Sequence, residues 1–279
     1  MTMKKPKEDG QSSRERLAPQ AVRLRQVSKV YAGREGQVAA LQEFSCDIAE
    51  GEFAVILGPS GCGKSTVVRI IAGLEQASSG TVSVNGAPVA RPGKSCSMVF
   101  QSYTSFPWLT VLENIAFGLE YTFPGTKRER VERARELARM VELDRFQNSY
   151  IRELSGGMRQ RVAIASALGT NAPILLMDEP FGALDSQTRM LMQEHLLKLT
   201  QESAQTVVFV THDIEEALLL GDRIYVCTAR PGSVLAELDV PFPYPRDSST
   251  RNAKKFGDLK YEIFHLLRNH IQDQPRRNR

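Results

Sequence analysis

The sequence predicts an α/β fold with a mostly parallel sheet core, and three patterns along its 279 residues support this. Apolar residues tend to alternate from Val22 to Ile48, which is typical of half-buried strands. The pattern turns helical between Val111 and Leu168. Continuous apolar runs that end abruptly at a polar residue are typical of strands covered by helices on both faces. Four such runs occur, at Phe53 to Leu57, Met98 to Phe100, Ile174 to Met177 and Val207 to Val210.

In chain order, the first elements are predicted strands of an antiparallel β subdomain. They comprise the stretch from Val22 to Ile48 and a second strand pair around the turn signal Asn85-Gly86. A helical insertion is predicted over about residues 102 to 168, because Lys127 to Leu143 is charged on one side and apolar on the other. Near the end of the chain, apolar residues recur at helical spacing at Phe256, Leu259, Ile263, Phe264 and Leu267.

These patterns divide the chain into three predicted parts. Residues 1 to 20 form a disordered tail, residues 21 to 240 one folded domain, and residues 241 to 279 a C-terminal extension with one helix. The plain interpretation of that helix is that it packs on the domain, and the alternative is a contact within a dimer.

Composition excludes several classes of protein. The formal net charge of +4 and the pI near 8.9 are mild, and much of the excess lies at the two ends, which we interpret as solvated tails. A nucleic-acid surface needs basic residues on one face, so we expect no nucleic-acid partner. The apolar runs are far shorter than the roughly 18 residues of a spanning helix, and the start carries no secretory pattern. Four scattered cysteines without a Cys-x-x-Cys pair indicate a reducing cytoplasm.

The segment from Gly58 to Thr66 matches the pattern G-x-x-x-x-G-K-[ST] between a predicted strand and an apolar helix. Glycines let the backbone wrap around phosphate oxygens, and the start of the helix adds its positive dipole end. Lys64 would neutralise the β- and γ-phosphates while Ser65 binds Mg²⁺. An ordinary Gly/Ser turn is the alternative, but the strand and helix favour ATP binding. The predicted nucleotide-binding residues here are Gly58, Pro59, Ser60, Gly61, Cys62, Gly63, Lys64, Ser65 and Thr66.

Two acidic residues follow the run from Ile174 to Met177. Adjacent acids after a strand are also common at the start of a helix, so alone they decide nothing. With a phosphate loop upstream, Asp178 becomes the candidate acid of the Mg²⁺ shell. Glu179 becomes the candidate general base that polarises water for attack on the γ-phosphate.

His212 follows the run from Val207 to Val210. A lone histidine is more often structural, but beside a phosphate site it can donate a hydrogen bond to the γ-phosphate and orient Glu179 and the water. Tyr31 is either a core aromatic or a platform on which adenine stacks. Ligands of parallel sheets bind beyond the carboxyl ends of the strands. We therefore expect five residues to gather along one edge of the sheet: Gly58, Gln101, Asp178, Glu179 and His212.

The stretch Leu154-Ser-Gly-Gly-Met-Arg-Gln-Arg161 resembles the signature motif of the ABC ATPases. Its physics is again anion binding, because Ser155, Gly156 and Gly157 open a helix with exposed N–H groups and a hydroxyl. The stretch Ile174-Leu-Leu-Met-Asp-Glu-Pro180 follows shortly after, in the order that the family shows. The resemblance implies a P-loop NTPase of ABC type that hydrolyses ATP with Mg²⁺.

The same resemblance, which extends from about Val22 to Gly232, implies roles for single residues. Tyr31 would stack on adenine, Gln101 would be the Q-loop residue, and Asp185 would belong to the D-loop near the nucleotide. Two departures, Gly182 for serine and Met158 for glutamine, resemble ordinary variants of importer subunits. The implied catalytic residues are Glu179, His212, Gln101 and Lys64. The implied Mg²⁺ ligands are Ser65, Gln101 and Asp178.

The resemblance also implies partners. In ABC ATPases the phosphate loop of one subunit and the signature of another enclose each ATP, so a chain with one of each needs a second ATPase subunit, most simply a homodimer. Three stretches resemble the nitrate, sulfonate and taurine branch of bacterial importers, at Gln101 to Asn114, Asp178 to Arg189 and Ala229 to Gly232. That branch implies a transmembrane permease, a periplasmic solute-binding protein that acts indirectly, and a peripheral position at the cytoplasmic face of the inner membrane.

Two alternatives stay open at this point. A soluble ABC-type ATPase of an assembly system would carry the same motifs without moving a solute. A single compact cassette disfavours only the translation-factor types with two cassettes and the repair types with inserted modules. In the segment after Gln101, Phe106 and Trp108 are either core aromatics of the helical insertion or part of a groove for a cytoplasmic helix of a permease.

Overall fold

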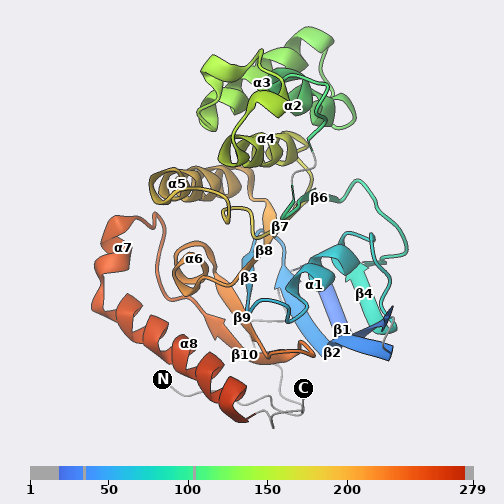
Figure 1. Ribbon diagram of the computed structural model, residues 1–279, viewed down its shortest axis with the longest axis vertical. Helices are drawn as coiled ribbons and strands as arrows, with labels where there is room; N and C mark the ends of the chain where they lie inside the picture. Colours follow the sequence, from blue (N-terminus) through green and yellow to red (C-terminus); the bar gives the residue numbers. More distant parts are fainter. Residues whose placement is uncertain (1–18, 34–35, 103–104, 274–279) are drawn as a thin grey trace. The chain divides into compact units, whose positions relative to one another are not determined.

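The computed structural model describes residues 19–33, 36–102 and 105–273. The predicted disordered tail lies outside the described residues except for its last two. The chain divides into two compact units, one of Met1–Pro92 with Val208–Arg279 and one of Gly93–Val207 (Figure 1). This division does not follow the predicted domain boundaries, since the second unit begins before the predicted insertion and extends well beyond it.

The first unit contains a four-stranded antiparallel sheet in the order β2-β1-β4-β5. Apolar side chains of β1, among them Val22, Leu24 and Val27, are fully buried, which explains the alternation in the sequence. Asn85 and Gly86 form the two-residue turn between β4 and β5 with φ of 49° and 76°, as the mirror-image hairpin turn requires. The antiparallel β subdomain is therefore confirmed. Its strands are β1 (Gln20–Gly33), β2 (Gly36–Ala49), β4 (Ser79–Val84) and β5 (Ala87–Pro88).

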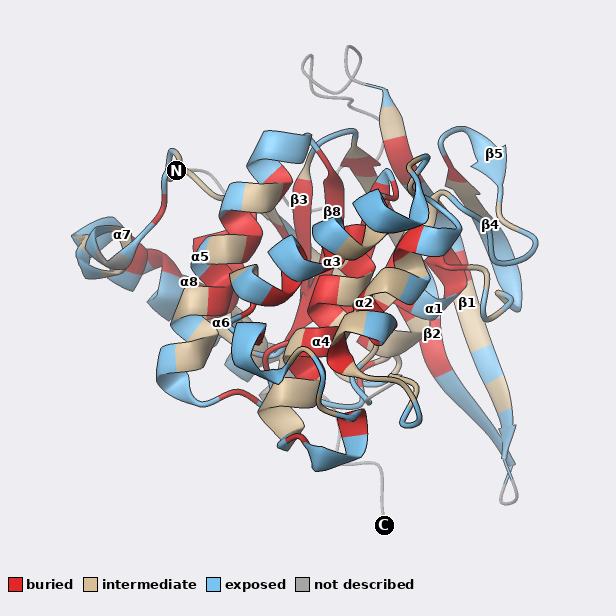
Figure 2. Ribbon diagram, turned by 90° about the horizontal axis from the view of Figure 1, so that it is seen from above, coloured by how far each residue is buried: buried red, intermediate tan, exposed pale blue. Residues whose placement is uncertain are grey.

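The same unit contains strands in the order β10-β9-β3-β8. These are β3 (Phe53–Leu57), β8 (Thr206–Thr211, of which the last four residues belong to this unit), β9 (Arg223–Cys227) and β10 (Val234–Asp239). The β3–β9 pair is parallel and the β9–β10 pair antiparallel. Every residue of β3 and β8 is buried, as their continuous apolar runs predict (Figure 2). The sequence patterns missed β10, an edge strand in which no residue is fully buried.

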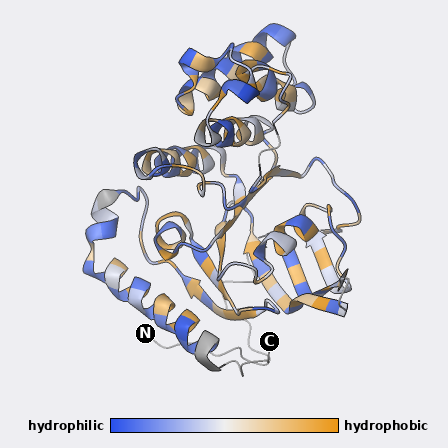
Figure 3. Ribbon diagram, in the orientation of Figure 1, coloured by the Kyte–Doolittle hydropathy of each residue, from blue (hydrophilic) through white to orange (hydrophobic). Residues whose placement is uncertain are grey.

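Helices of the first unit are α1 (Lys64–Ile71), α6 (Ile214–Leu220), α7 (Ser248–Asn252) and α8 (Lys254–Asp273). One helix was predicted after residue 240, and the structure contains two, because Ala253 adopts an extended backbone between α7 and α8. Hydrophobic and hydrophilic residues alternate around α8 (Figure 3), which buries Phe256, Leu259 and Ile263. Arg246, itself buried, donates hydrogen bonds to the carbonyls of Leu219 and Gly221 at the end of α6.

Among its described residues, the second unit combines a parallel strand pair, β6 (Cys96–Val99) with β7 (Ile174–Asp178), and four α-helices. These helices are α2 (Val111–Glu120), α3 (Lys127–Met140), α4 (Gly156–Gly169) and α5 (Ser186–Ser203), and short 3-10 turns lie at Asp144–Phe146 and Ile151–Glu153. Capping boxes begin α2 and α3, where Thr110 pairs with Glu113 and Thr126 with Glu129. Helices α2, α3 and α4 contact one another within the stretch where helices were predicted. The structure thus confirms an α/β fold with a mostly parallel sheet core, an antiparallel β subdomain and a helical region.

Candidate functional site

The loop after β3 has the backbone that a phosphate-binding loop requires. Gly61 and Gly63 adopt left-handed φ values of 78° and 94°, which side chains disfavour. A Cβ on Gly63 would lie 2.6 Å from the carbonyl oxygen of Ala40, so only glycine fits between the loop and β2. Gly63 is also the N-cap of α1, and the loop therefore ends at the positive end of a helix dipole.

Lys64 directs its charge into this loop. Its side chain is buried, with 5% exposure, and its Nζ donates hydrogen bonds to the carbonyls of Gly58 at 2.8 Å and Pro59 at 2.9 Å. The backbone N–H of Cys62 also donates to the Pro59 carbonyl, at 3.4 Å. The loop is thus closely wound around an ammonium group, an arrangement suited to a multiply charged anion.

Tyr31 lies beside the end of the same loop. Its hydroxyl is 3.4 Å from Oγ1 of Thr66, and the Nζ of Lys29 lies 4.9 Å from the centre of its ring. The half-buried ring therefore stands next to the start of α1 rather than within the core. An aromatic face in this position is compatible with the predicted platform for adenine.

His212 follows β8 at the neighbouring strand end. The backbone N–H of Gly58 donates to the Thr211 carbonyl at 3.4 Å, so the phosphate loop and the His212 segment leave the sheet side by side. The Thr211 hydroxyl donates to Glu216 at 2.7 Å and accepts from the backbone N–H of Asp213 at 3.0 Å. These bonds hold the backbone on both sides of the exposed His212.

In the second unit, Asp178 is the last residue of β7 and is 1% exposed. Glu179 follows with a φ of 46°, a left-handed backbone that costs a non-glycine residue on the order of 1–3 kcal/mol and is found preferentially at functional sites. Its carbonyl accepts from the N–H of Gly182 at 3.3 Å. Because Val99 pairs with Met177, Asp178 at the end of β7 and Gln101 just after β6 lie at adjacent strand ends.

The signature segment caps a helix, as its sequence predicts. The Ser155 hydroxyl accepts from the backbone N–H of Met158 at 3.3 Å at the start of α4. A Cβ on Gly157 would lie 3.4 Å from the carbonyl of Ala183, so the signature and the D-loop are close neighbours within this unit. Nucleotide contacts of Ser155, Gly156 and Gly157 stay predictions.

Asp185 is the N-cap of α5. Its carboxylate accepts from the backbone N–H of Thr188 at 3.0 Å and of Gln187 at 3.2 Å. Hydrogen bonds from the backbone and side chain of Thr188 lower the pKa of Asp185 below the ordinary aspartate value. In this structure Asp185 begins a helix, and its contact with nucleotide stays a prediction.

The predicted site residues thus fall into two sets, one in each compact unit. Tyr31, Gly58 to Thr66 and His212 come together in the first unit, and Gln101, Ser155 to Gly157, Asp178, Glu179 and Asp185 belong to the second. Gathering of all of them along one edge of the sheet stays a prediction.

The predicted Mg²⁺ ligands Ser65, Gln101 and Asp178 offer a hydroxyl, an amide oxygen and a carboxylate. Such hard oxygen donors suit Mg²⁺, which is usually bound through one or two carboxylates together with phosphate oxygens and water. Accordingly, within the described ranges no group of three or more His, Cys, Asp or Glu residues could hold a metal ion. The donor chemistry therefore fits a Mg²⁺ ion that arrives with a nucleotide.

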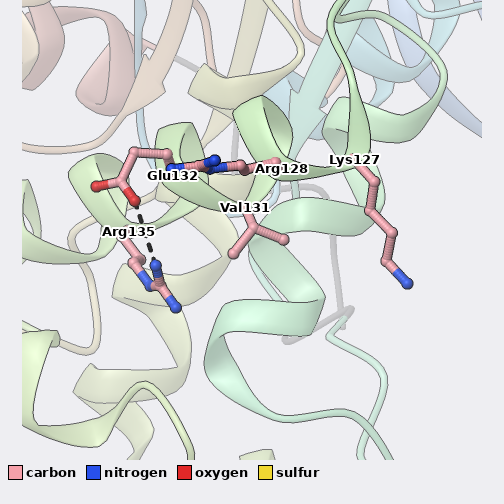
Figure 4. A pocket seen from close by; sticks show the side chains of 5 residues that line it. All are labelled: Lys127, Arg128, Val131, Glu132 and Arg135. Carbon is pink, nitrogen blue, oxygen red and sulfur yellow. Dashed lines mark hydrogen bonds and ion pairs between the residues drawn. The ribbon is translucent and has the colours of Figure 1, made fainter.

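A hollow elsewhere in the second unit lies on α3 and has a basic lining. Its lining residues are Lys127, Arg128, Val131, Glu132 and Arg135, and Glu132 pairs with Arg135 at 3.2 Å (Figure 4). None of the predicted site residues lines it. In the part of the chain that the structure describes, no helix is both long and apolar enough to cross a membrane.

One contact of the phosphate loop was not predicted from the sequence. The Nε of Arg230 donates to the carbonyl of Gly61 at 3.2 Å, across 169 positions of the chain. The stretch from Ala229 to Gly232 stood out only as part of a family resemblance, and no local pattern indicates that it touches the loop.

The fold and the two sets of residues define a class of protein: an α/β nucleotide-binding protein with a lysine-bearing phosphate loop after β3 and an acidic pair at the end of β7. A family model described as ABC transporter matches residues 41–182, about half of the chain. The chain belongs to the ABC transporter family, as its ATP-binding subunit and ATPase.

Several relatives are similar over most of their length. The chain is 48% identical to the taurine import ATP-binding protein TauB of Rhizobium johnstonii, over 86% of this chain and 94% of the relative. It is 43% identical to the nitrate import ATP-binding protein NrtD of Synechocystis, over 87% and 93%. It is 40% identical to the aliphatic sulfonates import ATP-binding protein SsuB of Bacillus cereus, over 87% and 94%.

Among solved structures, the fold is similar to the ATP-binding cassette MJ0796, solved as a dimer in a post-hydrolysis state bound to ADP and Pi. That match has a TM-score of 0.73 and 39% identity, and covers 80% of this chain and 100% of the other.

Proposed function

We propose that this ATPase works as a homodimer that energises uptake of a small solute of the nitrate, sulfonate or taurine type through a separate permease. Residues 21–240 would form the ATPase domain, with residues 241–279 as an appended extension. The relatives that carry the proposal are import ATP-binding proteins for these three solutes, each 40–48% identical to this chain. Because these relatives are import proteins, they also favour a role in transport over the alternative of a soluble ABC-type ATPase in an assembly system.

The observation that carries nucleotide binding is the winding of the loop from Gly58 to Thr66 around the Lys64 ammonium. In the proposal the loop N–H groups and Lys64 bind the β- and γ-phosphates, and Tyr31 stacks on the adenine. The buried ammonium supports this role, since a buried charge is costly unless the loop serves an anion, and the two glycines adopt the left-handed backbone of the loop without strain.

The hydrolytic step would use residues that follow the strand ends. When bound, Mg²⁺ would be held by Ser65, Gln101 and Asp178 and would neutralise charge on the phosphates. Glu179 would accept the proton of the attacking water, and His212 would donate a hydrogen bond to the γ-phosphate. The left-handed backbone of Glu179 supports a functional constraint at this position.

Each ATP would be enclosed by two chains. The chain holds one phosphate loop, and the signature of Ser155 to Gly157 would contact the nucleotide of the partner, with Asp185 close by. The relative MJ0796 was solved as a dimer with ADP and Pi, which supports the same arrangement here.

A permease would dock on a surface that we call the aromatic patch: the exposed Trp108, Phe117 and Tyr121 with the half-buried Phe106. Trp108 is 69% and Tyr121 66% exposed, and the ring centres of Phe106 lie 5.6 Å from Trp108 and 4.7 Å from Phe117. Such exposure favours the groove interpretation of Trp108 over a core role. The patch lies just after the Q-loop, where one segment could respond to both ATP and a partner.

A buried asparagine fixes the backbone of the segment from Phe106 to Thr110, which begins the patch. Asn114 accepts from the backbone N–H of Phe106 at 2.8 Å and donates to the carbonyls of Phe106, Leu109 and Thr110. The importer relatives support the rest of the proposal, in which this chain is a peripheral subunit at the cytoplasmic face of the membrane and a periplasmic solute-binding protein acts indirectly.

The experiment that tests the phosphate loop is Lys64→Ala. Loss of the ammonium should abolish high-affinity ATP binding, because Lys64 is the main side-chain charge in the loop. Equilibrium titration with a labelled ATP analogue and Mg²⁺ measures this, with Lys127→Ala, an exposed lysine on α3, as the control. Unchanged affinity in a folded Lys64→Ala chain would refute the assignment of the loop.

The experiment that tests transport uses the chain co-purified with its permease in proteoliposomes. ATP hydrolysis should rise when the loaded solute-binding protein is added with nitrate, an alkylsulfonate or taurine. No stimulation by any of the three would contradict the proposed solute class while leaving ATP binding intact.

A further inference from the structure

The turn between β9 and β10, residues 228–233, is a self-contained structure in the first unit. The backbone N–H of Thr228 donates to the Ser233 carbonyl at 2.9 Å. The Thr228 hydroxyl accepts from the N–H of Ser233 and donates to the Pro231 carbonyl, both at 2.9 Å. This turn therefore has a defined shape of its own and can support a neighbouring segment.

That neighbour is the phosphate loop, and the turn reaches it through β2. The N–H of Gly232 donates to the Ala40 carbonyl and its carbonyl accepts from Gln42, both at 2.9 Å. A Cβ on Gly232 would lie 1.9 Å from the carbonyl oxygen of Cys62, which no real side chain tolerates. Glycine at 232 is thus required by the close approach of the turn to the loop.

A second contact comes from the side chain of Arg230. Its Nε donates to the carbonyl of Gly61 at 3.2 Å. Since a trans peptide is planar and its C=O and N–H point in opposite directions, this bond also orients the N–H of Cys62. That N–H donates at 3.4 Å to the Pro59 carbonyl, which in turn accepts from the Lys64 ammonium at 2.9 Å.

The peptide that Arg230 restrains, between Gly61 and Cys62, lies where the loop backbone most needs restraint. Gly61 is exposed and left-handed, and glycine has the largest backbone freedom of any residue. A loop that also populates other conformations binds its ligand more weakly, in proportion to the fraction that is competent. An external hydrogen bond to Gly61 raises that fraction without touching the ligand.

We propose that Arg230 is a positioning residue for ATP binding: with Gly232, it holds the phosphate loop in its binding conformation from outside. The proposal rests on the proposed role of the loop from Gly58 to Thr66. It assigns a role to the Ala229 to Gly232 stretch, which the hydrolytic chemistry leaves unused.

Two matched variants separate the hydrogen bond from the charge. In Arg230→Gln an N–H donor stands the same number of bonds from the backbone as Nε of arginine, but the charge is gone. In Arg230→Met a methyl group stands there instead, so both charge and donor are gone. We expect the ATP dissociation constant to rise about three- to tenfold in Arg230→Met. Arg230→Gln should retain most of the affinity that Arg230→Met loses.

Binding of a non-hydrolysable ATP analogue with Mg²⁺ to the full chain measures both variants. An affinity of Arg230→Met equal to that of the natural chain would overturn the proposal. Equal weakening in Arg230→Gln and Arg230→Met would overturn it as well, because charge rather than the hydrogen bond would then act. Lys64→Ala distinguishes failure of the Arg230 proposal from failure of the proposed role of the phosphate loop. If the Lys64→Ala chain binds the analogue normally, the loop assignment itself is wrong.

Hydrogen exchange supplies a readout that a merely structural role would not move. Amides of residues 58–64 should exchange faster in Arg230→Met than in Arg230→Gln, while the melting temperature stays the same because Arg230 is exposed. Gly232→Ala should weaken analogue binding more than Gly257→Ala, whose added methyl meets nothing within 4 Å. Normal binding and exchange in Gly232→Ala would contradict the support from the turn.

Discussion

At the scale of single residues, the two members of the acidic pair Asp178 and Glu179 differ in burial and in backbone conformation. Asp178 is buried at the end of β7, whereas Glu179 turns out of the strand with a left-handed backbone and partial exposure. One carboxylate is therefore placed within the sheet and the next one beyond it. This difference suits a metal ligand and a general base in adjacent positions.

Glu179→Gln should keep ATP binding and reduce hydrolysis by at least roughly a hundredfold, because an amide cannot accept the proton of the water. Glutamine has the same shape and the same backbone preferences, so the left-handed turn is retained. Steady-state phosphate release together with analogue binding measures the effect. A turnover rate within a few-fold of the natural chain would assign the general base elsewhere.

At the scale of elements, the helices begin at residues that the sequence marks as caps. Glu113 accepts hydrogen bonds from the backbone N–H and the hydroxyl of Thr110, and Glu129 accepts the same two bonds from Thr126. These bonds lower the pKa of both carboxyls. A carboxyl whose pKa is lower in the folded state contributes stability above its unfolded pKa. That contribution is lost as the pH falls through the folded value.

Replacing both residues, Glu113→Gln with Glu129→Gln, should flatten the loss of stability in acid. Glutamine completes a capping box but does not titrate, so the melting temperature near neutral pH should change little. Below about pH 4 the natural chain should lose more of its melting temperature than the double variant. Glu120→Gln, an exposed change that caps no helix, is the control, and parallel acid profiles for all three chains would contradict this role of the caps.

Also at the scale of elements, the aromatic patch allows a test of whether Trp108 docks a permease or packs within the helical region. Trp108→Ala should leave the melting temperature nearly unchanged, since the indole is 69% exposed, and should abolish co-purification with the permease. Tyr261→Ala on α8, with 67% exposure, removes an equally exposed aromatic outside the patch and should retain the permease. A destabilised Trp108→Ala chain that still binds its permease would exclude the docking role.

At the scale of the whole molecule, one chain carries one phosphate loop and one signature, and in the proposal its function therefore depends on a second copy. The signature serine both begins α4 and, in the proposal, faces the nucleotide of the partner. A change at Ser155 should therefore affect association more than binding to a single chain.

Ser155→Arg, made in the Glu179→Gln background, should abolish the dimer that ATP and Mg²⁺ otherwise hold together. The large cation should block closure between chains while sparing analogue binding at the loop of each chain. Light scattering measures the association, and Ser155→Thr, which keeps the hydroxyl and the cap, is the control. A stable ATP-dependent dimer of the arginine variant would contradict the composite site.

Sequence alone determined the buried strands β3, β7 and β8 and the polar candidate site residues at their carboxyl ends. The reason is local: a continuous apolar run specifies a buried strand, and the polar residue that ends it marks the functional end of the sheet. The same holds for the glycine spacing of the phosphate loop and for the serine that caps α4. Strand β10 was not predicted although four of its six residues are apolar, namely Val234, Leu235, Ala236 and Leu238. As an edge strand it has no fully buried residue.

Only the tertiary structure decided whether Trp108 is exposed and what holds the loop from outside. Exposure depends on the helices that pack nearby, and residues 106 to 110 alone do not specify them. The bond from Arg230 to Gly61 joins residues 169 positions apart, and it exists because β9 pairs in parallel with β3. Contacts of this kind depend on strand pairing, which no local period in the sequence records.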